Sequence, residues 1–270
     1  MPSPNPRPGV DLDLRHAREV AIAAARSAGE ILSRRIDSIR EVRHKSAVDL
    51  VTDVDLQSEH EVSSALLSAF PTHSVLGEEG GARVGTDRRY RWIVDPLDGT
   101  TNYAHGFPFF CVSIGLEVES QMALGVAYAP SMDELFVAEA GRGATVNDRP
   151  IRVSSTRDLP QALLATGFPY DRAEFPRALK SFEVLSLRSQ AVRRAGSAVL
   201  DLCYVACGRL DGYWEHHVKA WDLAAGALMV LEAGGAVTAT DGSEFSVDGG
   251  QVLASNGLLH SDMAATLAGL

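Results

Sequence analysis

Apolar residues recur along this chain with two different periods. In residues 12–36 they return every three to four positions, as at Ala24, Ala28 and Ile31, which predicts an amphipathic helix. The same period predicts a second helix over residues 54–69. Shorter apolar runs then predict strands near residues 74–76, 91–95, 110–118, 122–128, 134–139 and 151–153.

The rest of the chain alternates between strands and helices. Strands are expected near residues 162–166, 191–194, 211–215, 236–239 and 251–255. Helices are expected near residues 173–188, 197–207, 222–233 and 258–268. Helices that pack against mixed sheets give an α/β or α+β layered architecture.

Composition and charge narrow the classes of protein to which this chain can belong. The chain has 270 residues, of which 46% are hydrophobic, so it can bury a substantial core as one compact unit or as two closely packed lobes. Its formal net charge of -10 argues against direct binding to nucleic acid or to an anionic membrane. No apolar run approaches the length of a membrane span.

The N-terminus and the cysteines indicate the compartment. Residues 1–10 are rich in proline and lack the apolar stretch of a signal peptide, which predicts a disordered leader. Cys111, Cys203 and Cys207 all lie in apolar stretches. They are expected to be core residues in a reducing compartment, which favours the cytoplasm.

Two carboxylates, Asp95 and Asp98, stand three residues apart where an apolar strand is expected to end at Asp95. Open α/β sheets bind ligands at the carboxyl ends of their strands. Pro96 fixes the local backbone, so the carbonyl of Leu97 can turn toward a cation that Asp95 binds. Oxygen ligands of this kind select hard cations, and Mg²⁺ is the usual one in phosphate chemistry. The same run is also good turn chemistry, so taken alone it leaves both interpretations open.

A candidate phosphate-binding turn follows this motif directly. Gly99, Thr100 and Thr101 offer backbone N–H groups and hydroxyls of the kind that hold phosphate oxygens. The sequence thus places a candidate anion site beside a candidate cation site.

Acidic residues stand out at three other places. Glu78 and Glu79 follow an apolar strand, Asp222 opens a helical pattern, and Asp55 lies near the start of the second helix. Each place also has an ordinary structural explanation. Glu78 and Glu79 fit a solvated acidic loop, Asp222 fits a helix N-cap, and capping explains the acids and hydroxyls that precede Asp55.

Taken in order, these motifs resemble the inositol monophosphatase family. The resemblance rests on the segments Lys45–Asp55, Gly77–Glu79, Trp92–Asn102 and Trp221–Gly226, with further likeness over Gly141–Ser154 and Arg194–Ala198. It runs from about residue 15 to the C-terminus. The resemblance implies a five-layer αβαβα sandwich of the sugar-phosphatase type that forms a homodimer. It also implies an N-terminal lobe over residues 11–150 and a C-terminal lobe over residues 151–270.

The resemblance implies that the acidic residues hold two cations, with a third, weaker Mg²⁺ in some members. The implied ligands of the first Mg²⁺ are Glu78, Asp95 and the carbonyl of Leu97, and those of the second are Asp95, Asp98 and Asp222. Two metal ions that share a carboxylate can stabilise both the attacking and the leaving oxygen of an in-line displacement.

The resemblance also implies how the reaction and the substrate are handled. Thr100, hydrogen-bonded to Asp55, would act with Glu78 to orient and deprotonate a metal-activated water that attacks phosphorus. The implied substrate contacts are Asp98, Gly99, Thr100, Thr101, Gly196, Ser197, Ala198, Glu215 and Asp222.

The activity that the resemblance implies is Mg²⁺-dependent hydrolysis of a small polyol phosphate, with inhibition by lithium. Myo-inositol 1-phosphate is the first candidate substrate, and histidinol phosphate, fructose 1,6-bisphosphate and an adenosine bisphosphate are alternatives. A protein-interaction role in transcription antitermination is an alternative of a different class. His216 and His217 leave two interpretations open, a polar loop or a basic segment that favours a second anionic group on the substrate.

Overall fold

The structure, a computed structural model, describes residues 12–36, 42–44, 50–169 and 171–270. The leader expected at residues 1–10 and the segment 45–49 of the first acidic motif lie outside these residues.

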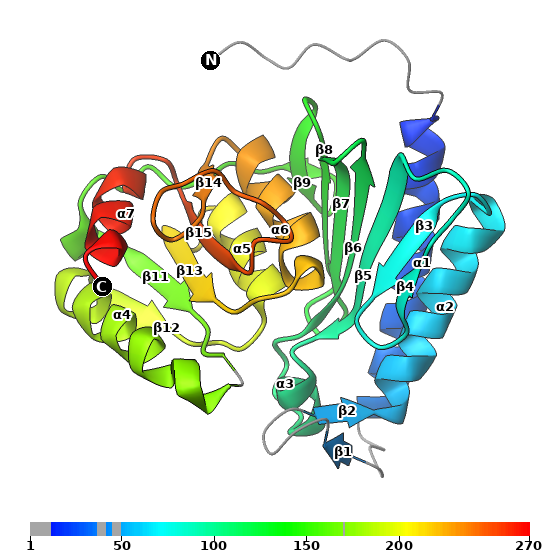
Figure 1. The fold of residues 1–270 in the computed structure, drawn as a ribbon, viewed down its shortest axis with the longest axis horizontal. Helices are drawn as coiled ribbons and strands as arrows, with labels where there is room; N and C mark the ends of the chain where they lie inside the picture. Colours follow the sequence, from blue (N-terminus) through cyan, green and yellow to red (C-terminus); the bar gives the residue numbers. More distant parts are fainter. Residues whose placement is uncertain (1–11, 37–41, 45–49, 170) are drawn as a thin grey trace.

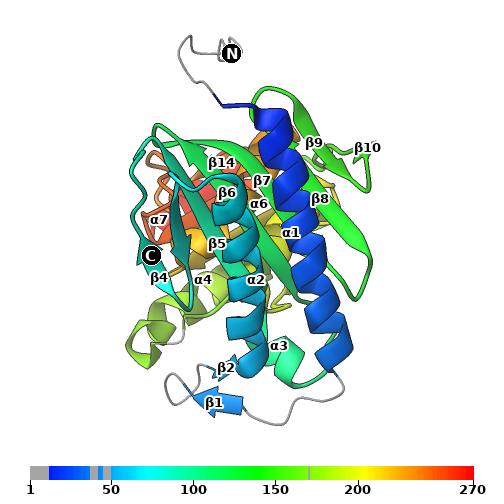
Figure 2. The ribbon, with the colours of Figure 1, turned by 90° about the vertical axis from the view of Figure 1, so that its right-hand side faces the viewer.

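Helices and sheets alternate in five layers across the molecule (Figure 1). The helices are α1 (Leu14–Arg35), α2 (Asp53–Ala69), α3 (Thr100–Ala104), α4 (Phe175–Arg188), α5 (Ala198–Ala206), α6 (Ala220–Glu232) and α7 (His260–Ala268). Helices α1 and α2 lie side by side on one face of the larger sheet (Figure 2). Helices α5 and α6 lie between the two sheets, and α4 and α7 cover the outer face of the smaller sheet. The αβαβα sandwich expected from the sequence is confirmed.

The larger sheet is mixed and has the strand order β10-β9-β8-β7-β6-β5-β3-β4. Its strands are β3 (Ser74–Gly77), β4 (Gly81–Arg83), β5 (Tyr90–Asp98), β6 (Cys111–Val118), β7 (Gln121–Ala129), β8 (Glu134–Glu139), β9 (Gly143–Val146) and β10 (Arg149–Pro150). Strands β3 and β5 are parallel, and the other pairs in this sheet are antiparallel. Because β3 and β5 are parallel, their carboxyl ends lie at the same edge of the sheet, where the candidate site is found.

The smaller sheet is also mixed, with the strand order β12-β11-β13-β15-β14. Its strands are β11 (Leu163–Thr166), β12 (Ala191–Arg193), β13 (Gly212–His216), β14 (Ala236–Thr238) and β15 (Gln251–Ser255). Strand β11 runs parallel to both of its neighbours. Two short strands, β1 (Val42–His44) and β2 (Leu50–Thr52), form a separate antiparallel pair. No helix in the described part of the chain is long and apolar enough to cross a lipid bilayer.

Helix α1 shows how the sequence pattern becomes a packed element. Its N-cap is Asp13, whose carboxylate accepts hydrogen bonds from the backbone N–H groups of Arg15 and His16 at 3.0 and 3.2 Å. Small apolar residues such as Ala21 and Ala28 are fully buried on the face that meets the sheet. Because these side chains are small, the helix can approach the sheet closely.

Two sequence predictions about strands are wrong, and several strands were not predicted. Residues 151–153 are not a strand, because Ile151 and Val153 donate their backbone N–H groups to two different partners, Ala144 and Ala233, and so make no ladder. A hairpin of β9 and β10 precedes these residues, and strands β1, β2 and β4 were not predicted. Strand β5 does not end at Asp95 but continues to Asp98 after an irregularity.

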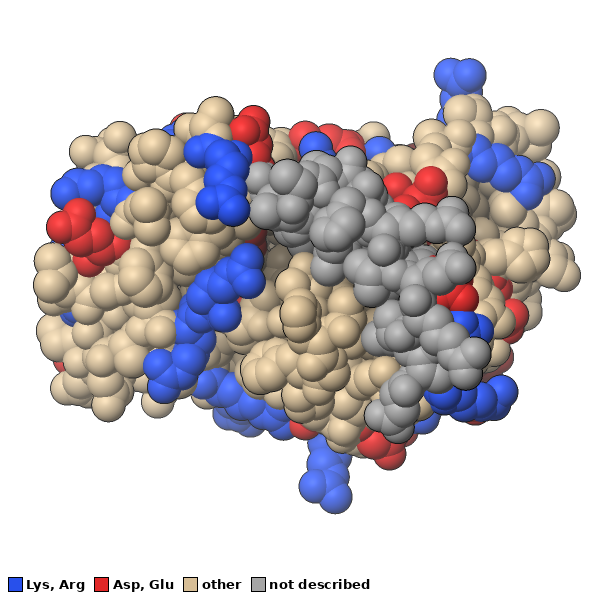
Figure 3. All heavy atoms as spheres, turned by 90° about the horizontal axis from the view of Figure 1, so that it is seen from below, with Lys and Arg blue, Asp and Glu red and all other residues tan. Residues whose placement is uncertain are grey.

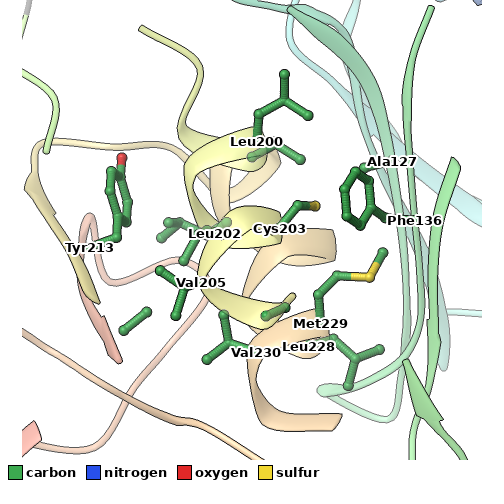
Figure 4. Packing of buried hydrophobic residues seen from close by; sticks show 14 of the residues in the cluster. Ala127, Phe136, Leu200, Leu202, Cys203, Val205, Tyr213, Leu228, Met229 and Val230 are labelled. Carbon is green, nitrogen blue, oxygen red and sulfur yellow. The ribbon is translucent and has the colours of Figure 1, made fainter. Parts of the chain in front are cut away.

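The central core fills the space between the two sheets. Helix α5 contributes Leu202, Cys203 and Val205, and α6 contributes Leu228 and Met229, all of them buried (Figure 4). A helix that is apolar all round needs burial on all sides. Helices α5 and α6 pack against both sheets, so a division of the chain into two lobes near residue 150 stays a prediction.

Two facing glycines let α6 lie close to the larger sheet. Gly115 on β6 and Gly125 on β7 are paired across the strands. A Cβ atom on Gly115 would lie 2.7 Å from the Cβ of Ala224, and one on Gly125 would lie 2.9 Å from the carbonyl oxygen of Ala225. The pair therefore sets the distance between the sheet and α6.

We expect Gly125→Ala to destabilise the fold by about 1–3 kcal/mol, because the new methyl group must push the backbone of α6 away. Urea unfolding followed by circular dichroism measures this change. Gly269→Ala is the matched control, since its Cβ would come no closer than 3.8 Å to another atom and should change stability by less than about 0.5 kcal/mol. Equal stabilities of the two variants would contradict the close approach.

Candidate functional site

The parallel pairing of β3 and β5 brings the first two acids together. Gly77 on β3 pairs with Val94 on β5, so Glu78 and Asp95 are the next residues at the same edge of the sheet. The backbone N–H of Glu78 donates a hydrogen bond to the carbonyl of Val94 at 3.3 Å. Asp95 is 1% exposed, and Glu78 is half-buried. Two acidic motifs that are separate in the sequence thus lie at the same edge of the larger sheet.

The backbone between Asp95 and Asp98 is held from both sides. The N–H of Leu97 donates to Oδ1 of Asp95 at 3.0 Å, and the Ser58 hydroxyl on α2 donates to the Pro96 carbonyl at 2.8 Å. The Leu97 carbonyl lies 3.1 Å from the hydroxyl of Thr100, which donates to it. These contacts hold the irregular end of β5 in one conformation.

Three carboxylates converge at this place. Oxygen atoms of Asp95, Asp98 and Asp222 all lie within 4.8 Å of one another. Asp222 comes from the first turn of α6, where its Oδ2 accepts a hydrogen bond from the N–H of Lys219 at 2.7 Å. Asp222 is therefore not the N-cap itself but reaches back to the N-cap residue, Lys219. Asp222 thus both stabilises the start of α6 and belongs to the cluster of three carboxylates.

Burial makes the charged forms of these acids unfavourable. Burial, followed by the charges of Glu78 and Asp98, raises the pKa of Asp95 well above its ordinary value. Burial and then the charge of Asp98 raise the pKa of Asp222. Burial also raises the pKa of Asp98 to about 6, against the hydrogen bonds that it accepts. A divalent cation would relieve this repulsion.

The donor set fits Mg²⁺. It consists of carboxylate oxygens with a carbonyl nearby, and oxygen is the ligand type that this cation prefers. Glu78 lies outside the tight group of three, yet its charge acts on both Asp95 and Asp222. The structure therefore groups three of the acidic residues named from the sequence and places the fourth at their edge.

Asp98 also joins the two halves of the chain. Its Oδ2 accepts hydrogen bonds from the Ser197 hydroxyl at 2.5 Å and from the N–H of Val199 at 2.7 Å. Ser197 is the N-cap of α5 and is 1% exposed. A carboxylate at a helix N-terminus is stabilised by the helix dipole. The side chain of Ser197 thus holds Asp98, which leaves only its backbone for a substrate.

Thr100 and Asp55 meet beside the cluster. The Thr100 hydroxyl donates to Oδ1 of Asp55 at 3.0 Å, the contact that the family resemblance implies. Asp55, on α2, is fully buried. Gly99 before Thr100 has a φ of 96°, and a Cβ there would lie 2.9 Å from the Phe109 carbonyl, so only glycine fits. Thr101 follows in α3 and is half-buried.

A cleft of about 90 Å³ opens beside the acidic cluster. Its lining residues include Asp98, Gly99, Gly196, Ser197, Ala198, Asp201, Glu215, Asp222, Gly167 and Arg194. Burial raises the pKa of Glu215 to about 7, and the hydroxyl of Tyr213 donates a hydrogen bond to its carboxylate. Gly167 packs directly against Glu215, since a Cβ there would lie 2.1 Å from the carboxylate. Most of the substrate contacts expected from the sequence thus line one cleft.

The two adjacent histidines do not line this cleft. His216 is buried, lies 3.4 Å from the Thr240 hydroxyl, and has its pKa lowered to about 4 by burial. His217 is exposed and its Nε2 lies 3.0 Å from Glu174. These contacts give no support to a second anion site, and the loop interpretation fails for His216, which ends strand β13 and pairs with Gln251 on β15.

Exposed basic side chains occur on and around α4, and one of them, Arg194, lines the cleft. Seen from below, Lys and Arg side chains gather over the half of the molecule that carries α4 (Figure 3). Exposed basic residues in this part of the chain are Arg172, Arg177, Lys180, Arg193, Arg194 and Lys219. On a chain with a net charge of -10, such a local excess of positive charge would attract an anionic phosphate ester.

Two supporting residues were missed in the sequence. Glu59 on α2 is 8% exposed and accepts hydrogen bonds from the N–H groups of Glu79 at 2.8 Å and Gly80 at 2.6 Å. Asn102 donates to the carbonyls of Phe109 and Ala195, at 2.7 and 2.8 Å. Glu59 could have been noticed in the sequence, because it is an acid on the apolar face of the second predicted helix. For Asn102, no pattern in the sequence indicates its hydrogen-bond partners.

Comparison with known proteins gives one consistent family. Residues 13–269 match the inositol monophosphatase family. The chain is 43% identical to the inositol-1-monophosphatase of Synechocystis over 258 residues, which cover 95% of this chain and 90% of that protein. It is 44% identical to Nus factor SuhB of Pseudomonas aeruginosa over 244 residues, which cover 88% and 90%. The solved inositol monophosphatase of Anabaena (Nostoc) matches with a TM-score of 0.88 at 44% identity, covering 96% of this chain and 98% of that one.

The carboxylate of Glu59 accepts hydrogen bonds from the N–H groups of Glu79 and Gly80 with its two oxygens and so holds the loop after Glu78. An amide has only one acceptor oxygen, so we expect Glu59→Gln to weaken Mg²⁺ binding by about tenfold. The increase of melting temperature with Mg²⁺ concentration measures this affinity. Glu61→Gln is the control, since Glu61 lies on the same helix but accepts its hydrogen bond from Ser27, away from the cluster. Unchanged Mg²⁺ dependence in Glu59→Gln would contradict the role of this carboxylate.

We expect the melting temperature in EDTA to fall as the pH rises from about 4, the ordinary pKa of an aspartate, through about 6, the raised pKa of Asp98. The pKa values of Asp95, Asp98 and Asp222 are raised in the folded state. In that window the folded protein retains protons that the unfolded chain has released, so stability decreases with pH. Saturating Mg²⁺ should remove this decrease, since the cation replaces the protons.

The variant Asp222→Asn separates the cluster from other titrating groups. His73 and His216, whose pKa values are lowered by burial, titrate alike in the variant and the wild type. The variant should therefore show a flatter profile in EDTA and a smaller gain from Mg²⁺. Parallel profiles for the two proteins would show that the cluster does not carry the pH dependence.

Proposed function

Since this chain belongs to the inositol monophosphatase family of phosphatases, we propose that it hydrolyses a small polyol phosphate with the help of Mg²⁺. The observation that carries the proposal is the group of buried Asp95 and Asp98 and half-buried Asp222, with oxygens within 4.8 Å of one another, of which Asp98 and Asp222 line a cleft. Myo-inositol 1-phosphate is the substrate that we propose first, because the relatives that match over most of the chain include inositol-1-monophosphatases.

The proposed ligands of the first cation are Glu78, Asp95 and the carbonyl of Leu97, and those of the second are Asp95, Asp98 and Asp222. Supporting this, one oxygen of each of the three aspartates lies within 4.8 Å of the others, and each carboxylate also accepts a backbone hydrogen bond. When bound, Mg²⁺ would supply Lewis acidity toward the phosphoryl oxygens and lower the pKa of a nearby water. Water can then attack without a covalent phosphoenzyme.

Thr100, Asp55 and Glu78 would handle the proton of the attacking water. Because the Thr100 hydroxyl donates its proton toward Asp55 and the Leu97 carbonyl, its lone pairs are free to accept a hydrogen bond from water. That orientation would point the water oxygen toward phosphorus. Glu78 would then take the proton as general base.

The phosphate and the alcohol would bind on opposite sides of Asp98. Backbone N–H groups of Gly99, Thr100 and Thr101 would hold phosphate oxygens. On the other side, the backbone of residues 196–198 and the carboxylate of Glu215 line the cleft, where they would bind hydroxyls. We further propose a homodimer and a cytoplasmic location, as expected from the sequence.

A second candidate function follows from the relatives. One protein with 44% identity is named Nus factor SuhB. We therefore also propose that this chain can serve transcription antitermination through a protein surface. Since hydrolysis depends on the acidic cluster and a docking surface does not, the two roles are separable by mutation.

The proposed reaction is tested by phosphate release from a panel of inositol 1-phosphate, histidinol phosphate, fructose 1,6-bisphosphate and adenosine 3′,5′-bisphosphate. We expect activity only with Mg²⁺, greatest with inositol 1-phosphate, and inhibited by Li⁺. Asp95→Asn should reduce turnover by at least about a thousandfold, since a buried ligand shared by both cations is lost. Hydrolysis of no ester by the wild type would refute the proposal.

Asp248→Asn is a suitable control, because Asp248 pairs with Arg91 at 2.8 Å and belongs to no part of the cleft described above. It should keep activity within about twofold. If Asp95→Asn abolished hydrolysis but restored antitermination in a cell that lacks this protein, the second role would be independent of the chemistry. Loss of both together would remove the interaction candidate.

A further inference from the structure

Asp201 is a buried carboxylate in the cleft that the proposed reaction does not use. It lies on α5, is 2% exposed, and lines the cleft together with Glu215 and Arg194. Among the described residues, none donates a hydrogen bond to its carboxylate. Buried carboxylates are costly without donors. The carboxylate of Asp201 therefore receives no hydrogen bond from the described part of the protein and is available to a ligand in the cleft.

Other buried acids of this chain do not share this deficit. Asp211 is 7% exposed, and its two carboxylate oxygens accept hydrogen bonds from the Ser154 hydroxyl at 2.5 Å and the N–H of Leu163 at 2.7 Å. Asp98 accepts from Ser197 and Val199. The fold thus supplies donors to both of these buried acids, whereas none of the described residues donates to Asp201.

The charges around Asp201 indicate what kind of donor fits. Burial, followed by the negative charges of Glu215 and Asp98, raises the pKa of Asp201, and the positive charge of Arg194 lowers it. Arg194 acts on Glu215 in the same direction. Arg194 already supplies a positive charge in the cleft, so a neutral hydroxyl is sufficient as the hydrogen-bond donor to Asp201.

We propose that Asp201 is a specificity-determining residue whose carboxylate accepts a hydrogen bond from a hydroxyl of the alcohol half of the substrate. This inference rests on the proposed phosphatase function. Glu215 has one oxygen occupied by the Tyr213 hydroxyl and can take a second hydroxyl with the other. The preferred substrate class is thus a phosphate ester of a neutral polyol with at least two hydroxyls besides the ester oxygen.

The test compares two substrates that share the phosphate and differ in the alcohol. We expect Asp201→Asn to lower kcat/KM for inositol 1-phosphate by roughly ten- to a hundredfold, because the amide offers one acceptor oxygen in place of two and turns an N–H donor toward the substrate hydroxyl. For phenyl phosphate, which has no hydroxyl, the change should be less than about twofold. Asp262→Asn, an exposed position on α7, is the matched control and should change neither value.

A second measurement keeps the test valid if the amide disturbs packing. Asp201→Ser is assayed beside Asp201→Asn, and melting temperatures report the folding of both variants. The wild type and both variants are also assayed with inositol 1-phosphate analogues that each lack one hydroxyl. One analogue should lose activity with the wild type but show no further loss with the variants, because the removed hydroxyl is the partner of Asp201.

The other outcomes overturn the inference in recognisable ways. Equal losses with inositol 1-phosphate and phenyl phosphate would show a structural role for Asp201. A greater loss with histidinol phosphate than with inositol 1-phosphate would show recognition of a cation instead of a hydroxyl. Hydrolysis of neither ester by the wild type would instead refute the phosphatase proposal and this inference with it, whereas unequal effects on a working enzyme concern Asp201 alone.

Discussion

The repulsion among three buried carboxylates is the constraint on which the site depends. Asp95, Asp98 and Asp222 lie together with little access to water, and each has one oxygen held by a backbone N–H, from Leu97, Val199 and Lys219 respectively. These hydrogen bonds fix the carboxylates in an arrangement that is unfavourable until positive charge arrives. The fold thus prepares a place for a divalent cation and accepts some loss of stability without one.

The helix layer between the sheets brings the parts of the site together. Helix α6 carries Asp222 and reaches the larger sheet where Gly115 and Gly125 leave room for its backbone. Helix α5 points its N-terminus at Asp98 and carries Asp201 less than one turn further along. Since both helices are buried on all sides, neither can shift without disturbing the core of the molecule (Figure 4).

The sequence predicted elements whose pattern is local and missed those set by distant partners. Helices α1 and α2 follow from their apolar period, and the acids of the cluster follow from their motifs. Strand β4 is exposed throughout, so it shows no alternation of apolar and polar residues. The bond between Asp98 and Ser197 joins residues 99 positions apart, and the donors that hold Glu59 lie on another element. No local pattern encodes such contacts.

The contact between Asp98 and the N-terminus of α5 has a consequence for the affinities with which the site would bind the cation and the alcohol. This carboxylate belongs to the acidic cluster, and its Oδ2 accepts a hydrogen bond from the first turn of the helix that carries Asp201. A cation bound to Asp98 would therefore act through this bond on the first turn of α5, beside the residues that would receive the alcohol. Thermodynamic linkage makes this effect mutual, so an alcohol that orders α5 must also tighten the hold on the cation. Cation and substrate would then bind as cooperative ligands of one site.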